Sequence, residues 1–367
     1  MRILSIVSLV SAIVVGFVVL GVWAWAHSPW AIAGDQAQTI AKVRSMGGNV
    51  DPLLSGDRLP EVVGVFRFCD VSLKEARFTD EDLAVLDGLH ASMTLILSDT
   101  NVSDRGIRVL SQLNQSKVHE IDLSGTKISD EALEHLEKMP GLSRIDLSRT
   151  SVTDNQLWRL KAMKDMRHIR VADTGITDEG VKSLIHVLRS SGHGKDLDLS
   201  GTVISDACLE DLKGLGFDNL KLSHTKVTDK GIMHLLGSRI ESLSVSNTKV
   251  TDSGIEMLYQ LKGLGTLDLG STAISGTGIA ELSRLKMLFR LTLDNTPVGN
   301  DEMKALSTIS GLSSLSVAHT DVTDAGLHYL KRLGRLRYLD VSGTRVTRGA
   351  VERLKVSMPG LTEVVGP

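Results

Sequence analysis

The chain has 367 residues, and its 41 lysine and arginine residues nearly balance 44 aspartate and glutamate residues, for a formal net charge of −3. No long run of one charge sign occurs, so the composition gives no support to a nucleic-acid-binding surface or a polybasic membrane patch. Length alone would suggest about two or three globular domains, but an internal repeat replaces that expectation with one repeat array.

The first predicted element is a hydrophobic segment at residues 3–26, which contains no charged residue. At about 1.5 Å per residue it is long enough to cross a hydrocarbon core of about 30 Å. Arg2 precedes it, whereas the first charges after it are Asp35 and Lys42. The positive-inside rule therefore places the N-terminus in the cytoplasm and the rest outside. We expect residues 1–34 to be a signal anchor, with the remainder periplasmic or on the cell surface.

A cleaved signal peptide is the alternative, and it would make the protein secreted. Small residues flank two candidate cleavage sites, at residues 24–26 and 31–33. The hydrophobic core of a signal peptide usually spans about 7–15 residues, and this segment is longer. The length favours an uncleaved anchor, and the rest of the chain is exported in both cases.

The next two segments lead into the repeats. Residues 35–60 are predicted to form a juxtamembrane helix, Asp35–Met46, ended by two glycines, and then a loop from Asn49 to Pro60. Residues 61–91 are predicted to form a capping repeat with a strand at Val62–Phe68. An atypical first repeat is expected because its outer side has no neighbouring repeat to cover it.

Residues 92–367 repeat one phrase eleven times and end in a truncated half repeat that contains Val364 and Val365. When a recurring threonine is counted as position nine, apolar residues recur at positions one, four, six and eleven. This pattern predicts a short strand, and the Ser/Thr-Asp pair that follows predicts a helix start. The threonines are 23 or 24 residues apart, except for 26 at the first interval and 28 before Thr202, where an insertion surrounds residues 190–194. They are Thr100, Thr126, Thr150, Thr174, Thr202, Thr225, Thr248, Thr272, Thr296, Thr320 and Thr344.

The phrase L-x-x-L-x-L-x-x-T-x-V/I-[ST]-D resembles the leucine-rich-repeat family, whose ninth position is usually Asn or Cys. It is most similar to the cysteine-containing subtype, with threonine in the cysteine column. With its N-terminal anchor, the chain resembles the exported and membrane-anchored leucine-rich-repeat proteins of bacteria. The resemblance implies an α/β leucine-rich-repeat solenoid, with a curved parallel sheet on the concave side and helices on the convex side, preceded by one transmembrane helix.

The threonine column is predicted to be a structural ladder. At position nine the chain leaves the strand, which exposes backbone N–H and C=O groups inside the stack. A threonine hydroxyl can donate to and accept from such groups while its methyl group packs. We therefore assign these threonines to stability.

The cysteines are predicted to be unpaired. Cys69 and Cys208 lie about five rungs apart, which at about 4.8 Å per strand is roughly 25 Å and too far for a disulfide. Cys208 occupies a column otherwise filled by glycine and alanine, so we expect a small buried hydrophobe.

No catalytic group, cofactor or metal site is predicted. Asp122 and Asp146 should lie about 5 Å apart on adjacent strands, the carboxylate separation of a retaining glycosidase. A charge ladder neutralised by neighbouring basic residues explains them more simply. His224 and His319 share a column but lie about 20 Å apart, too far to bind one ion.

A recognition surface for a protein partner is the remaining candidate, and it makes the chain a non-catalytic binding scaffold. Charged residues gather on the concave face of the second to sixth repeats, and arginine is common in binding hot spots. An envelope polysaccharide is an alternative ligand, because the later repeats carry serine and threonine there, although aromatic stacking residues are few. A substrate-recognition domain of the ubiquitin-ligase type is disfavoured, because residues 27–60 are too few for an adaptor-binding domain. The predicted binding residues are Glu120, Asp122, Arg144, Asp146, Arg167, Arg170, Asp198 and Lys221.

Overall fold

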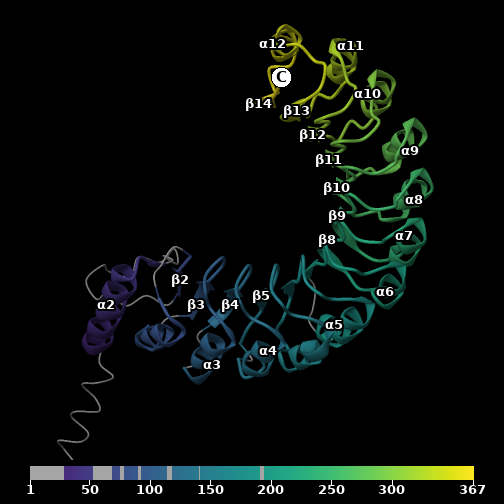
Figure 1. The fold of residues 1–367 in the computed structure, drawn as a ribbon. Helices are drawn as coiled ribbons and strands as arrows, with labels where there is room; N and C mark the ends of the chain where they lie inside the picture. The colour runs from purple at the N-terminus through teal and green to yellow at the C-terminus, as the bar shows by residue number, and fades with distance from the viewer. Residues whose placement is uncertain are drawn as a thin grey trace, which may run out of the picture.

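The computed structural model describes residues 29–52, 68–74, 78–89, 92–113, 118–139, 141–190 and 194–367. These residues form a curved solenoid with the strands along its inner side and the helices along its outer side (Figure 1). The predicted anchor at residues 3–26 lies outside the described ranges. Within them, no helix has the combination of length and apolar character that crossing a membrane requires.

The described strands form one sheet in chain order. Neighbouring strands run parallel, except for the first pair, which is antiparallel. The strands are β1 (Asn49–Pro52), β2 (Phe68–Ser72), β3 (Ser92–Ile96), β4 (Val118–Asp122), β5 (Arg144–Asp146), β6 (His168–Arg170), β7 (Asp196–Asp198), β8 (Phe217–Lys221), β9 (Ile240–Ser244), β10 (Thr266–Asp268), β11 (Arg290–Thr292), β12 (Ser314–Ser316), β13 (Tyr338–Asp340) and β14 (Glu363–Val365).

Helices alternate with these strands, and several of them are short or 3₁₀ in character. Ser and Thr residues cap the N-termini of many of them, as the Ser/Thr-Asp pair predicts. The helices are α2 (Pro29–Ser45), η1 (Asp80–Gly88), α3 (Asp104–Gln112), α4 (Asp130–Leu136), η3 (Asp154–Ala162), α5 (Asp178–Ser190), α6 (Asp206–Asp211), α7 (Asp229–Leu235), α8 (Asp252–Met257), η4 (Leu258–Gln260), α9 (Gly276–Glu281), η5 (Leu282–Arg284), α10 (Asn300–Leu306), α11 (Asp324–Leu327), η6 (His328–Arg332) and α12 (Arg348–Ser357).

The core is a stack of identical repeat positions. Ile121, Ile145 and Ile169 hold position four in successive rungs, pair in register across β4, β5 and β6, and are almost completely buried. Each rung, numbered from one by its threonine, adds its own apolar residues to this stack. Hydrophobic burial is therefore continuous along the solenoid, as the repeat predicts.

The N-terminal end differs from the sequence prediction at β1. The predicted loop at Asn49–Pro60 begins with β1, whose Val50 is fully buried and which pairs with β2. Of the strand predicted at Val62–Phe68, residues 62–67 lie outside the described ranges, and Phe68 begins β2. Val71 of β2 pairs with Leu95 at position four, so β2 keeps the register of the strands that follow.

The helix α2 is longer than predicted, and it packs on η1 at the end of the solenoid. Val43 is fully buried there and belongs to the main core. β1 and α2 together cover β2 and η1, at the end of the solenoid that no earlier repeat protects.

Position eight has a left-handed backbone in all eleven rungs. Gly125, Gly201 and Gly343 have φ of +68°, +67° and +66° there. The other eight rungs use non-glycine residues with φ between 50° and 58°, which are Asp99, Arg149, Asp173, His224, Asn247, Ser271, Asn295 and His319. This left-handed residue turns the chain out of the strand just before the threonine.

Candidate functional site

The threonine hydroxyls make a hydrogen bond within their own rung. In every rung the Oγ1 donates to the carbonyl oxygen of the residue at position six; for example, the distance from Thr202 to Leu199 is 2.6 Å. Thr202 is only 3% exposed. The column thus satisfies the carbonyl of the residue that directly follows the strand, where the chain turns.

A second ladder connects one rung to the next on the convex side. The aspartate in the first turn of one helix accepts hydrogen bonds from the backbone N–H and hydroxyl of the Ser or Thr that caps the next helix. Asp130, for instance, accepts from Thr153 at 2.7 Å and 2.5 Å. The same arrangement joins Asp80 to Ser103, Asp104 to Ser129, Asp154 to Thr177, Asp178 to Ser205, Asp206 to Thr228, Asp229 to Thr251, Asp252 to Ser275 and Asp324 to Thr347.

This aspartate ladder explains the column of small residues. A Cβ built on Gly106 would lie 2.5 Å from the Asp80 carboxylate, and one on Gly326 would lie 2.7 Å from Asn300. Cys208 fills the same column as a buried free thiol, with its Sγ 3.3 Å from the Ser205 carbonyl oxygen. The prediction of a buried unpaired cysteine is therefore confirmed.

The ladder is interrupted at one step within the described rungs. Gly276 stands where the aspartate is expected, and Gly299 stands where the next rung has its Ser or Thr. The Gly299 N–H donates instead to Glu302 in its own helix, at 2.8 Å. The Glu302 carboxylate thus takes the place of the missing aspartate as the acceptor. Because Glu302 belongs to the same rung as Gly299, the hydrogen bond between the two rungs is lost.

The concave face carries ion pairs between adjacent strands. Arg170 lies 3.6 Å from Asp146, and Lys221 lies 3.2 Å from Asp198. The cationic side chains are 41% and 40% exposed, whereas the two aspartates are only 16% and 14% exposed. Arg144 is likewise 41% exposed beside Glu120 at 26%. The surface that a partner meets is therefore more cationic than the sequence count implies.

The recessed aspartates at position five also stabilise their own turns. Asp122 and Asp146 each accept a hydrogen bond from the backbone N–H two residues later, both at 2.9 Å. Asp198, Asp268 and Asp340 do the same. Asp122 and Asp146 are adjacent in register, but these contacts give them a local structural role. The geometry matches the predicted charge ladder better than a catalytic pair.

Serine residues dominate the concave face farther along, and they bond to one another. Ser244 lies 2.6 Å from Ser223 and donates to Asp268 at 2.7 Å, and Ser246 donates to Ser223 at 2.9 Å. Each of these hydroxyls already has a protein partner.

Comparisons with known proteins agree with this architecture. A family model described as Leucine Rich repeat matches residues 163–184. An internalin (inlF) from Listeria monocytogenes is similar over 77% of this chain and 76% of that chain, with a TM-score of 0.53 and 20% identity. An internalin C2 (inlC2) from the same organism gives a TM-score of 0.40 and 19% identity over 64% of this chain and 84% of that chain. No curated protein sequence matches the chain.

The repeat match and the shared solenoid identify the fold. The chain has the leucine-rich-repeat fold. At 20% identity, the likeness to the internalin is a likeness of fold alone. The predicted parallel sheet and convex helices of a leucine-rich-repeat solenoid are thereby confirmed.

The predicted binding residues of this leucine-rich-repeat protein come together on neighbouring strands. Glu120, Asp122, Arg144, Asp146, Arg170, Asp198 and Lys221 lie on β4 to β8, and Arg167 is exposed just before β6. We call these eight residues the charged concave patch. Within the described residues, no group of His, Cys, Asp and Glu side chains has the arrangement of a metal site.

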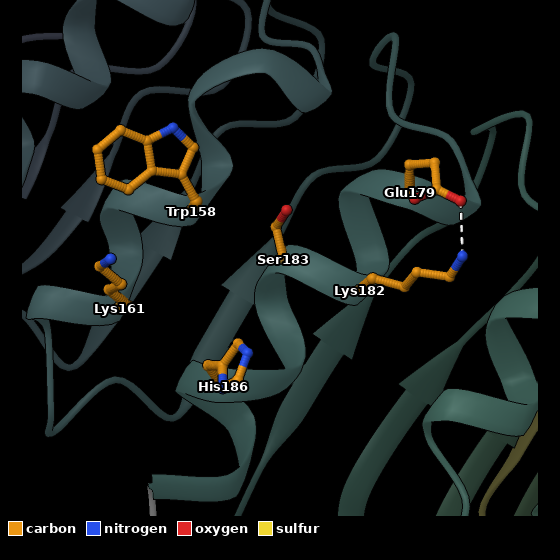
Figure 2. A pocket seen from close by; sticks show the side chains of 6 residues that line it. All are labelled: Trp158, Lys161, Glu179, Lys182, Ser183 and His186. Carbon is orange, nitrogen blue, oxygen red and sulfur yellow. Dashed lines mark hydrogen bonds and ion pairs between the residues drawn. The ribbon is translucent and has the colours of Figure 1, made fainter.

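The convex side contains a groove that sequence reasoning missed. Trp158 and Lys161 of η3 form one wall, and Glu179, Lys182, Ser183 and His186 of α5 form the other (Figure 2). The groove is open and has a volume of about 680 Å³. The sequence did contain a signal, because Trp158 occupies a helix column that is otherwise mostly charged. In the structure its side chain is 43% exposed. We call these six residues the Trp158 groove.

Proposed function

We propose that this chain is a membrane-anchored, extracytoplasmic leucine-rich-repeat protein that binds a protein partner through the charged concave patch, without catalysis. The observation that carries the proposal is the exposure of Arg144, Arg170 and Lys221 above recessed carboxylates on adjacent strands. The sheet holds Arg170 and Lys221 at the same repeat position two strands apart, which is about 10 Å, and Arg144 lies on the strand before Arg170. Exposed ion pairs contribute only about 0–1 kcal/mol, so a partner's carboxylates can replace the recessed ones at little cost. The patch fits an acidic surface.

The anchored location rests on residues 3–26, whose length and lack of charge are those of a transmembrane helix. If the anchor is retained, the protein should fractionate with membranes and resist carbonate extraction. A mature N-terminus after residue 26 or 33, found by mass spectrometry, would instead indicate cleavage and secretion.

The binding test uses a partner isolated from detergent-solubilised envelope and titrated against purified variants. Arg170→Glu should weaken binding by more than about tenfold, because it reverses the charge at the centre of the patch. Arg170 is the sharp probe, since replacing Asp146 would also remove its bond to the Ser148 N–H.

The matched control is Lys304→Glu, which reverses an exposed charge on the convex helix α10. It should leave binding unchanged. Weaker binding in Lys304→Glu together with normal binding in Arg170→Glu would show that the concave patch is not the site. Thermal melts of both variants should match the parent, because both side chains are exposed.

A polysaccharide ligand is a second candidate, supported by the hydroxyl cluster of Ser223, Ser244 and Ser246 on the concave face. Those hydroxyls already bond to each other and to Asp268, so a sugar would have to displace them. This makes polysaccharide binding the weaker proposal. Binding of purified envelope glycan that is lost in Ser244→Ala but retained in Arg170→Glu would favour it.

A further inference from the structure

We propose that the Trp158 groove is a second binding site, on the convex side, for an acidic peptide segment that also carries an apolar side chain. Its place on the helices separates it from the charged concave patch on the strands (Figure 1). The inference does not depend on the proposed function of that patch. It rests on the exposure of Trp158, the open groove between η3 and α5, and the distribution of charge around it.

Trp158 is not required by the repeat. Its column lies eight residues after each threonine, on the outer face of the helices. The other rungs fill it with Arg108, Glu134, Lys182, Glu210, Met233, Glu256, Ala280, Lys304, His328 and Glu352. Because the Trp158 side chain is 43% exposed, the hydrophobic core does not require a tryptophan in this column. Exposed tryptophan is instead typical of binding hot spots.

The second wall is formed by α5 (Asp178–Ser190), which packs beside η3. Its groove residues precede the insertion at residues 190–194 and occupy repeat positions that η3 also covers. Ser183 and His186 of α5 lie opposite Trp158 and Lys161 (Figure 2). The departure from the repeat at this place is therefore the tryptophan.

Two of the three cations in or beside the groove already have a carboxylate partner. Lys182 pairs with Glu179 at 2.6 Å. The Arg159 guanidinium, which lies 4.8 Å from the centre of the Trp158 ring, binds Glu137 at 2.7 Å. The Lys161 ammonium lies 4.9 Å from the same ring. Among the described residues, no carboxylate lies within ion-pairing distance of Lys161. A ligand carboxylate can therefore bind Lys161 while an adjacent apolar side chain packs on the exposed part of Trp158.

The neighbouring rungs limit the size and kind of ligand. In the column of Trp158 and Lys182, the flanking rungs carry the exposed residues Glu134 and Glu210. The two lysines of the groove, Lys161 and Lys182, are therefore confined to two rungs, with carboxylates on both sides. An extended anionic membrane surface would meet repulsion there, whereas a short acidic segment fits between the two glutamates.

The test is a selection of short random peptides on the full chain in detergent micelles, with counter-selection on Trp158→Ala. Enriched peptides are labelled and titrated by fluorescence anisotropy. We expect them to be acidic with an apolar residue, and to bind Trp158→Ala and Lys161→Glu more than about tenfold more weakly than the parent. Binding should also weaken as salt is raised.

The matched control is Met233→Ala, which removes a side chain that is 54% exposed in the same column three rungs later. It should leave peptide binding unchanged, and so should Arg170→Glu on the concave face. Circular dichroism melts establish that each variant is folded, and Trp158→Phe provides a milder replacement.

Four results would overturn the proposal. The selection could enrich no acidic peptides, or the enriched peptides could bind Trp158→Ala as tightly as the parent. Phosphatidylglycerol vesicles could also bind in a manner that depends on Trp158 while no peptide does, which would assign the groove to lipid. Loss of binding only in Arg170→Glu would move the site to the concave patch.

Discussion

The carboxylate of Asp178 accepts two hydrogen bonds from Ser205 of the next rung, one from its backbone N–H and one from its hydroxyl, each at 2.7 Å. Asp178 begins α5, and Ser205 caps α6. The residue that favours the start of one helix therefore also holds the start of the next. Repeated along the convex side, this contact links consecutive helices in the way that the sheet links consecutive strands.

Replacing Asp178 with alanine should reduce the free energy of unfolding by about 1–3 kcal/mol, because the partly buried Ser205 N–H loses its acceptor. Asp178→Asn should cost less, since Asn300 makes the same contact with Thr323, at 3.1 Å to the N–H. Urea unfolding measures both. Asp301→Ala, an exposed residue of α10, is the control and should change little; a loss equal to that of Asp178→Ala would contradict the ladder.

Acid should weaken the same ladder. Burial alone would raise the pKa of Asp178, but hydrogen bonds from Ser205 and Cys208 outweigh it and hold the pKa below its usual value. The pKa of Asp252 is lowered in the same way by Ser275 and Thr277.

A folded-state pKa below the unfolded value of about 3.9 gives stability that is complete above that pH. The stability is lost as pH falls through the folded-state pKa, because the unfolded chain then binds more protons. We expect the urea midpoint to fall below about pH 4. In Asp178→Asn the fall should be shallower; an unchanged slope would exclude Asp178 as a contributor.

The threonine column should respond more strongly to substitution than the open concave face. Thr202→Val keeps the shape but leaves the Leu199 carbonyl without its donor, so the free energy of unfolding should drop by about 1–3 kcal/mol. Ser314→Ala, on the concave strand β12, should cost less than about 0.5 kcal/mol. Similar losses in urea unfolding at the two positions would mean that the threonine hydroxyl does not stabilise the turn.

The step between Gly276 and Gly299 should be a weak point of the solenoid that can be repaired. Gly276→Asp combined with Gly299→Ser restores the aspartate–serine pair and should raise the free energy of unfolding by about 0.5–2 kcal/mol. A Cβ at Gly276 would lie 2.9 Å from the end of the Glu302 side chain, which is flexible enough to move. In the parent, amide exchange at the start of α10 should be faster than at α7; equal rates would argue against a weak step.

Much of the convex side could be predicted from the sequence, but the hydrogen-bond partners of its aspartates could not. The Ser/Thr-Asp pair predicts a capped helix start, and the structure has caps at Ser129 and Thr228. The sequence did not reveal that each aspartate serves the cap of the next rung, because those residues are 22 to 27 positions apart. The small-residue column was recognised as a pattern, and the structure supplies its cause: the aspartate lies against it.

The candidate sites, too, could be predicted from the sequence only in part. The repeat predicts which charged residues share the concave face, but it does not predict that Asp146 and Asp198 are recessed beneath Arg170 and Lys221. At the N-terminal end, the proline and glycine residues after Asn49 predicted a loop, whereas pairing with β2 makes Asn49–Pro52 a strand.

The sequence by itself determined the solenoid, because each repeat carries its own strand alternation, threonine and helix cap, and such local signals add along the chain. Only the tertiary structure decided the Trp158 groove. It depends on how η3 and α5 pack side by side, and no local pattern records that packing. Side-chain exposure and cross-rung contacts arise only when the rungs stack, since they belong to pairs of residues that sequence order keeps apart.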